Sequence, residues 1–158
     1  RNVYLPSTGA LRDDGLEQVW EAPMETGLIH LHKSLAHMLV LFALVSMILA
    51  VAGAGKKAGL AKAMLKTNKF GVLMLGRLIY VAGLGTAMMG GHSFLQPWVL
   101  AGIVLWGVVE VASKRMVTPE LEAVIEGGTG APKLIVGALL ELVIIVLVYG
   151  LMQMRITF

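Results

Sequence analysis

The feature that most constrains this fold is the stretch at residues 25–57, an apolar run with ionisable residues at both ends. It opens with two histidines and a lysine, ends at Lys56 and Lys57, and contains one ionisable group, His37, within the run. About 20 apolar residues are needed to cross a bilayer core of roughly 30 Å as a helix. The stretch therefore predicts a transmembrane helix with a polar entrance and an anchored exit.

Three further apolar runs follow, and 57% of the 158 residues are hydrophobic while 15% are charged. A soluble domain of this length could not bury that much apolar surface, so lipid is the expected solvent. Long apolar runs favour helices over barrel strands. We predict an all-α integral membrane protein, with a polar acidic tail at 1–27 and a domain at 28–158. The domain is an up-down-up-down bundle with spans at about 31–54, 70–90, 97–114 and 132–154.

Basic residues set the expected orientation, because short cytoplasmic loops carry an excess of lysine and arginine. The first loop, at 55–68, is rich in lysine, and its apolar residues recur at helical spacing. It predicts a short amphipathic helix lying on an anionic leaflet. The third loop holds Lys114, Arg115 and Lys133. Both loops are expected in the cytoplasm and both termini outside, on the periplasmic side of a bacterial inner membrane.

Several classes of chemistry are excluded by what the sequence lacks. There is no cysteine, which rules out disulfides, iron–sulfur ligation and thiolate metal sites within this sequence. No glycine-rich phosphate loop, nucleophile elbow or Ser/His/Asp arrangement is visible. The net charge of +3 comes mostly from the lysine-rich loop, so it indicates topology and not nucleic-acid binding.

Histidines form the first candidate site, on the outer side of the predicted bundle. His37 lies about one turn inside the apolar region, and His92 lies in the outer turn between the second and third spans. Together they are candidate ligands of a bis-imidazole haem b. The alternative is that they are interfacial histidines bonded to water, headgroups or backbone. No metal site is expected, because no carboxylate or cysteine completes the ligand set.

The second candidate site consists of ionisable residues inside the other three spans: Arg77, Glu110 and Glu141. Charges in hydrocarbon are costly, so we expect these three to pair with one another at similar depth. Tyr80 could bond into the same site, and Glu110 could instead pair with Lys114 at i+4. Three interpretations stay open: a structural ion pair, a quinone or proton-relay site, and contact with a partner subunit.

Glycines form a regular pattern on the second span. Gly76, Gly83 and Gly90 repeat every seven residues. Small residues at such spacing let a neighbouring helix approach closely. The pattern predicts a smooth seam along this helix.

Weak motifs over about 30–154 resemble small four-span membrane families. They are Gly76-Arg77-Leu78, Gly83, Trp98, a terminal VLVYGLMQMR, a histidine near the start of the first span and a basic first loop. The pattern resembles the SirB, CopD-like and HemJ-type protoporphyrinogen oxidase families. The HemJ resemblance implies haem at His37 and a role in activity for Arg77. The sequence departs from that pattern in lacking a proline after Arg77 and in having Arg155-Ile156 where Lys-Pro is usual.

The functional expectation is a small, non-catalytic subunit of a larger membrane complex, linked to electron transfer and with a role in assembly. The alternatives are a haem-b or quinone-binding redox protein and a HemJ-like oxidase. Transport is a weaker fit, because no inverted repeat or broken helix is visible. The expected partners are membrane lipids and other membrane-protein subunits, with no nucleic acid.

Overall fold

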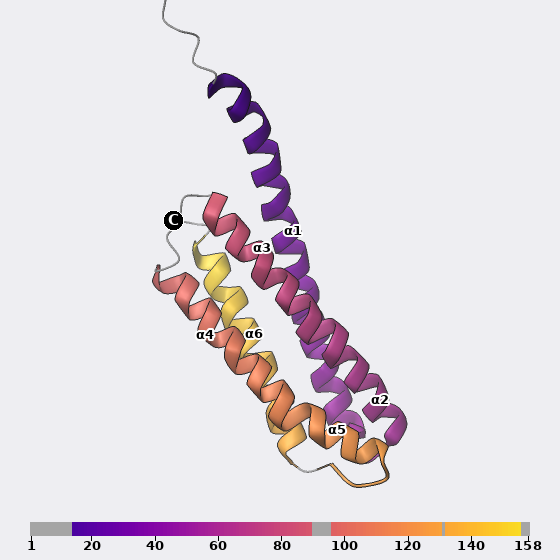
Figure 1. The fold of residues 1–158 in the computed structure, drawn as a ribbon. Coiled ribbons are helices and arrows are strands. Elements are labelled where there is room, and N and C mark those ends of the chain that lie inside the picture. Colours follow the sequence, from indigo (N-terminus) through magenta and orange to yellow (C-terminus); the bar gives the residue numbers. More distant parts are fainter. Residues whose placement is uncertain (1–13, 90–95, 131, 156–158) are drawn as a thin grey trace, which may run out of the picture.

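A computed structural model describes residues 14–89, 96–130 and 132–155, and these residues are helical apart from short connections. Four long helices lie side by side (Figure 1). The first combines α1 (Asp14–Leu49) and η1 (Ala50–Ala54). The second combines α2 (Ala58–Lys66), η2 (Thr67–Met74) and α3 (Leu75–Met89). The third combines α4 (Pro97–Ala112), η3 (Ser113–Val117) and α5 (Thr118–Ile125), and the fourth is α6 (Lys133–Arg155). The described residues contain no strand, which confirms the all-helical prediction.

Three of these helices are long and apolar enough to cross a membrane: Gly27–Ala54, Ala58–Met88 and Lys133–Leu151. Within the described residues, the helix at 97–125 is not among those identified. Large hydrophobic side chains are exposed along every helix, including Val51, Val81 and Val104, each of them more than 60% exposed. Soluble monomers rarely show so much contiguous apolar surface. The exposed surface is that of a membrane protein.

Residues 55–68 do not form the separate surface helix predicted from their lysines. Helix α2 continues without a break through η2 into α3, because Ala61 and Met64 are fully buried in the bundle core. The lysines of this segment lie on its exposed side. The first helix also differs from its expected bounds: it begins at Asp14, within the predicted tail.

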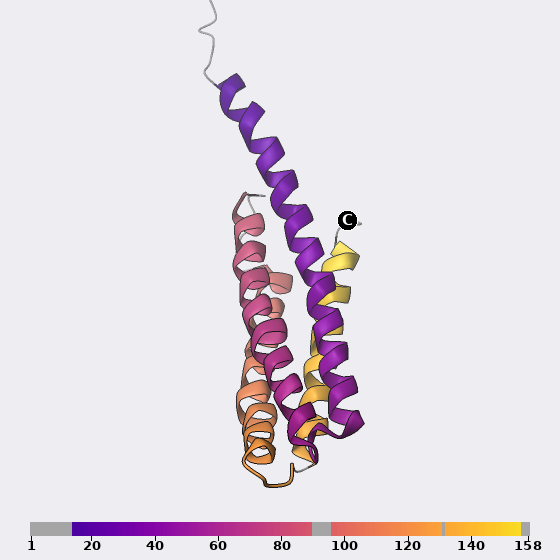
Figure 2. The same cartoon turned by 90° about the vertical axis from the view of Figure 1, so that its right-hand side faces the viewer.

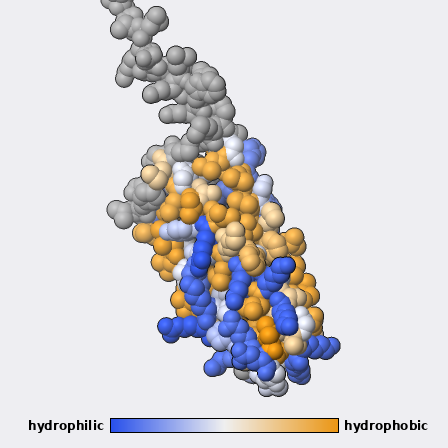
Figure 3. All heavy atoms as spheres, turned by 45° about the vertical axis from the view of Figure 1, so that its right-hand side comes forward, coloured by the Kyte–Doolittle hydropathy of each residue, from blue (hydrophilic) through white to orange (hydrophobic). Residues whose placement is uncertain are grey.

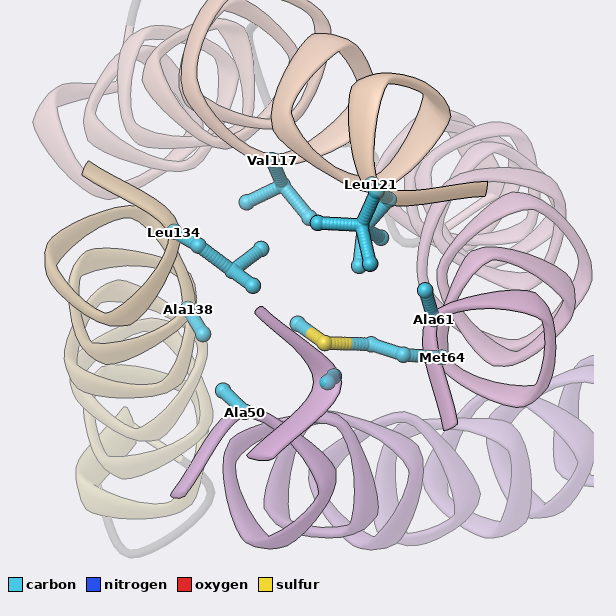
Figure 4. Packing of buried hydrophobic residues seen from close by; sticks show 9 residues of the cluster. Ala50, Ala61, Met64, Val117, Leu121, Leu134 and Ala138 are labelled. Atoms are coloured by element: carbon cyan, nitrogen blue, oxygen red, sulfur yellow. The ribbon is translucent and has the colours of Figure 1, made fainter. Parts of the chain in front are cut away.

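The core consists of two hydrophobic clusters stacked along the bundle. The first packs Met64, Leu121 and Leu134 toward one another from three helices, with Ala50 of the first helix beside them (Figure 4). The second includes Leu39, Val72, Val109, Ile144 and Ile145. Every one of the four helices contributes residues to both clusters. The same four helices therefore pack together at both levels of the bundle.

The connections at 55–57 and 126–130 meet at one end of the bundle, here called the basic end (Figures 1 and 2). The amide of Gly130 donates to the carbonyl oxygen of Gly55 at 2.8 Å, which ties the two connections together. Helix α5 ends where Gly127 has φ +97°, and Gly128 donates back to the Ala123 carbonyl oxygen at 2.9 Å. This glycine-dependent cap stops α5 and turns the chain toward α6.

Hydrophilic side chains gather toward the basic end, and the remaining surface of the same face is mostly hydrophobic (Figure 3). The opposite end holds the end of α3, the beginning of α4 and the end of α6, and α1 projects beyond them (Figures 1 and 2). Charge is therefore distributed asymmetrically along the bundle.

Candidate functional site

A layer of buried polar side chains separates the two hydrophobic clusters. Each long helix supplies one of them, and each is at most 1% exposed: Ser46, Asn68, Ser113 and Glu141. In each helix, a residue of the first cluster lies three or four positions to one side of the polar residue, and a residue of the second cluster lies three or four positions to its other side. Met64 and Val72 stand in this way around Asn68. Such spacing places a side chain on the same helical face as its neighbours. The polar layer is therefore built into the core-facing stripe of every helix.

Hydrogen bonds join three members of this polar layer across three helices. The Asn68 Nδ2 donates to both carboxyl oxygens of Glu141, at 3.0 Å and 2.9 Å. The Ser113 hydroxyl donates to Asn68 Oδ1 at 2.5 Å. An amide nitrogen carries two protons and an amide oxygen accepts, so the Asn68 side chain is used at both ends. The Ser46 hydroxyl, by contrast, is buried without a hydrogen-bond partner among the described residues.

The three ionisable residues predicted to pair do not all meet. Arg77 Nε lies 2.8 Å from Glu110 Oε1, and Lys114 Nζ lies 2.8 Å from Glu110 Oε2, so both pairings proposed for Glu110 exist together. Glu141 lies elsewhere, within the polar layer beside Asn68. Two differences keep them apart: Arg77 is exposed while Glu141 faces the core, and Arg77 lies nine residues along its helix from Asn68, the partner of Glu141, so the two also differ in depth.

The ion-paired trio Arg77, Glu110 and Lys114 is exposed on the side of the bundle. The Arg77 and Lys114 side chains are 55% and 58% exposed, and that of Glu110 is 24% exposed. Arg77 lies close to the middle of the apolar helix Ala58–Met88. A second pair, Lys69 with Glu122 at 3.3 Å, joins the same two helices closer to the basic end.

Both ring nitrogens of His37 are engaged. Its Nδ1 lies 2.7 Å from the carbonyl oxygen of Lys33, and its Nε2 lies 2.6 Å from the Tyr149 hydroxyl. Because a carbonyl oxygen only accepts, Nδ1 carries the proton, and Tyr149 then donates to Nε2. The predicted partner His92 lies outside the described residues. No group of three metal-ligating side chains occurs within the part of the chain that the structure describes.

A cavity of about 120 Å³ lies among the four helices, in the half of the bundle away from the basic end. Its lining is largely apolar, with Tyr80, Thr86, Trp106 and His32 as its polar-capable members. Of the predicted site residues, Tyr80 is the one found here. The Nδ1 atom of His32 is buried without a partner among the described residues.

The predicted glycine seam of the second helix packs against side-chain rings of neighbouring helices and not against a bare helix backbone. A Cβ atom on Gly76 would lie 1.8 Å from Cη2 of Trp106, and one on Gly83 would lie 2.9 Å from Cε1 of His32. The glycines therefore admit Trp106 from α4 and His32 from α1, both of which line the cavity. Gly90 lies outside the described residues.

Sequence reasoning did not identify Asn68 or Ser113 as site residues. Asn68 follows a lysine-rich segment, where a polar residue is unremarkable, and Ser113 directly precedes Lys114. The signal that could have found them is the spacing of Met64, Asn68 and Val72, which continues one apolar face through the lysines.

The trio, the polar layer and the cavity are thus three distinct arrangements on one helical bundle. No family model, curated protein or solved structure matches this chain in a sequence or structure comparison.

Proposed function

We propose that this chain is a small integral subunit of a larger membrane complex, linked to electron transfer and serving in assembly. The observation that carries the proposal is the trio of Arg77, Glu110 and Lys114 on the side of the bundle. The geometry suits an interface, because the two cations are more than half exposed while the carboxylate between them is held by both.

Lipid is a poor neighbour for this trio. Charged groups in a membrane span normally face the protein interior, a water-filled cavity or another protein. Lys114 is close enough to the basic end for its flexible stem to reach the headgroups, but Arg77 lies nearer the middle of its helix. A polar surface of a neighbouring subunit would satisfy the remaining donors of the Arg77 guanidinium.

The proposed membrane arrangement has four crossings, with the basic end in the cytoplasm and both termini outside. The lysine and arginine distribution supports it through the positive-inside rule. In this arrangement the helix at 97–125 crosses with its partner helix 58–89 beside it, and Glu110 is neutralised by their shared ion pairs. A bacterial inner membrane is the compartment that this asymmetry fits best.

The geometry does not favour the haem-b alternative or the haem role that the HemJ resemblance implies. Iron ligation by His37 Nε2 would require loss of the 2.6 Å hydrogen bond from Tyr149. The other ring nitrogen is occupied by the Lys33 carbonyl oxygen.

Co-purification from the native membrane in mild detergent tests the subunit proposal. The chain carries an affinity tag and is compared with Glu110→Gln and with the control Glu122→Gln, which removes the other ion pair joining the same helices. We expect a stoichiometric set of membrane partners with the unmodified chain and with Glu122→Gln, and a several-fold loss with Glu110→Gln.

Thermal unfolding of each purified variant shows whether the bundle itself is intact. Absence of stoichiometric partners from the unmodified chain would overturn the proposal. Equal recovery of partners with both variants would remove the trio as the interface.

A further inference from the structure

The polar layer holds a carboxyl group that no cationic side chain neutralises. Glu141 is 1% exposed, and among the described residues it forms no ion pair. Lys69 and Lys114 directly follow Asn68 and Ser113 in the chain, but both lysines are exposed. They pair with Glu122 and Glu110 on the outer surface. A buried carboxylate without a cation is strongly disfavoured, so a bound positive charge would stabilise this layer.

The remaining charged residues of the four helices do not face the layer either. On the first helix, no ionisable residue lies within eight positions of Ser46. On α6, the nearest ionisable residues are Lys133, which is exposed, and Tyr149, which is hydrogen-bonded to His37. The other basic residues near the layer are also exposed: Lys62, Lys66 and Arg115. The charge of Glu141 must therefore be balanced by a small ion or a proton.

The hydrogen bonds of the layer suit two protonation states of Glu141. In the structure, Asn68 Nδ2 donates to both carboxyl oxygens and Ser113 donates to Asn68 Oδ1, which serves a carboxylate that only accepts. Turning the Asn68 amide over exchanges its nitrogen and oxygen at nearly the same positions. Oδ1 then accepts from a protonated Glu141, and Nδ2 donates to the Ser113 hydroxyl oxygen. Each contact is retained with its direction reversed, so either state has its partners.

A metal ion fits this layer less well than a proton. Both carboxyl oxygens of Glu141 already lie within 3.0 Å of the Asn68 nitrogen, whose protons repel a cation. No group of three His, Asp or Glu side chains that could hold a metal occurs among the described residues. A proton needs no additional space, because it lies within the hydrogen bond between carboxyl group and amide.

Two further features distinguish the layer from ordinary core packing. Asn68 lies within the π-helical segment η2, and Ser113 begins the π-helical segment η3. Such segments are rare and occur frequently at functional sites. At the same level of the core, the Ser46 hydroxyl is fully buried without a partner among the described residues. Buried hydroxyls are normally paired, so packing alone does not explain a polar residue there.

We propose that Glu141 is a buried proton-binding site, and that the Asn68 amide turns over when the proton binds. One proton from the surrounding water adds to a carboxylate oxygen, and the new O–H donates to Asn68 Oδ1. No bond between heavy atoms forms or breaks, and no electron is transferred. The site lies in the core while the trio lies on the outer side of the bundle, so the proposal does not depend on the subunit role.

Infrared difference spectroscopy of the full chain in lipid nanodiscs tests whether the proton binds. Spectra are recorded against pH for the unmodified chain, for Glu141→Gln and for the control Glu122→Gln, which removes an exposed carboxyl group. We expect a band of a protonated carboxyl group that grows as the pH is lowered, persists in Glu122→Gln and is lost in Glu141→Gln. Replacing choline chloride by sodium chloride at constant ionic strength should leave this band unchanged.

Nitrogen NMR of 15N-labelled asparagine tests whether the amide turns over. The sequence has two asparagines, Asn2 and Asn68, and Asn2→Ser identifies the resonances of the first by their loss. In the unmodified chain, the Asn68 side-chain resonances should change over the same pH range as the infrared band. In Glu141→Gln they should stay in the low-pH form at every pH, because the glutamine amide donates to Oδ1 as a protonated carboxyl group does.

Three results would each overturn the proposal. The first is the absence of a pH-dependent carboxyl band that Glu141→Gln removes. The second is a set of Asn68 side-chain resonances that do not change with pH in the unmodified chain, a measurement that needs no variant of the layer to fold. The third is loss of the carboxyl band on addition of sodium, which would make a metal ion the ligand.

Discussion

Asn68 is the residue on which the buried polar layer depends. Its amide nitrogen donates to both carboxyl oxygens of Glu141, and its carbonyl oxygen accepts from Ser113. All three side chains are at most 1% exposed, so no solvent can replace a missing bond. A buried polar network is stabilising when every group in it has a hydrogen-bond partner, and it becomes costly when one partner is removed.

Replacing Asn68 by leucine should therefore destabilise the bundle. The Glu141 carboxyl group would lose both donors, which is expected to lower the free energy of unfolding by about 1–3 kcal/mol. Reversible unfolding in mixed micelles with increasing dodecyl sulfate measures the change. Ser113→Ala should have a smaller effect, because the Asn68 amide still donates to Glu141.

The double variant Asn68→Leu with Glu141→Leu separates a structural role from a functional one. Replacing both partners by apolar groups of similar size can be nearly neutral, so stability should largely recover. If the single Asn68→Leu variant were as stable as the unmodified chain, the polar layer would have no structural role. A stable double variant that no longer supports its membrane complex would point to a functional carboxyl group.

At the scale of the element, the helix at 58–89 is shaped by its glycines. Gly76 lies against the Trp106 ring, so even the methyl group of alanine would overlap the indole. Gly71 is crowded in the same way by Phe42, where an added Cβ would lie 2.5 Å from its ring. These glycines set how closely the first, second and third helices approach one another.

Gly76→Ala should lower the thermal unfolding temperature, because it forces Trp106 out of its place. Overpacking of this kind typically costs about 1–3 kcal/mol. The control is Gly107→Ala in α4, where the added methyl group meets nothing within 4 Å and helix propensity predicts a neutral or slightly stabilising effect. Adding Trp106→Leu to Gly76→Ala should restore part of the loss; no loss in Gly76→Ala would contradict the close contact.

At the scale of the whole molecule, the uneven distribution of charge predicts a single orientation. The basic end carries both tied connections, and the polar surface of the visible face gathers there (Figure 3). Moving this end across the bilayer would transfer many lysines through hydrocarbon, which the positive-inside rule disfavours.

Because the sequence has no cysteine, single introduced cysteines can report the orientation. Lys57→Cys and Thr129→Cys should react with a membrane-impermeant maleimide only after the cytoplasmic side is exposed, and Asn2→Cys should react from outside. Labelling at all three positions after membrane solubilisation is the control for reactivity. Labelling of Lys57→Cys and Asn2→Cys from the same side would contradict the proposed topology.

The amino-acid sequence by itself determined that this chain is helical and that its apolar surface suits a membrane. Apolar runs longer than a membrane is thick cannot be buried in a small soluble domain, so an all-helical membrane-type chain follows from composition and run length. The lysines likewise predicted where charge would collect. The prediction of a separate surface helix at 55–68 was wrong, because Ala61 and Met64 are buried in the core although lysines surround them in the chain.

Tertiary structure alone decided which polar residues share a site. The sequence predicted comparable depths for Arg77, Glu110 and Glu141, but Glu141 lies level with Asn68, nine residues from Arg77 along its helix. The sequence also did not specify the rotation of each helix about its axis. That rotation is set by the packing of the whole core-facing stripe, which turns Glu141 toward Asn68 and leaves Arg77 and Glu110 on the outside. The same packing encloses His32 beside Gly83 and leaves its Nδ1 unpaired. Contacts between side chains more than thirty positions apart arise from such packing, and no local pattern records them.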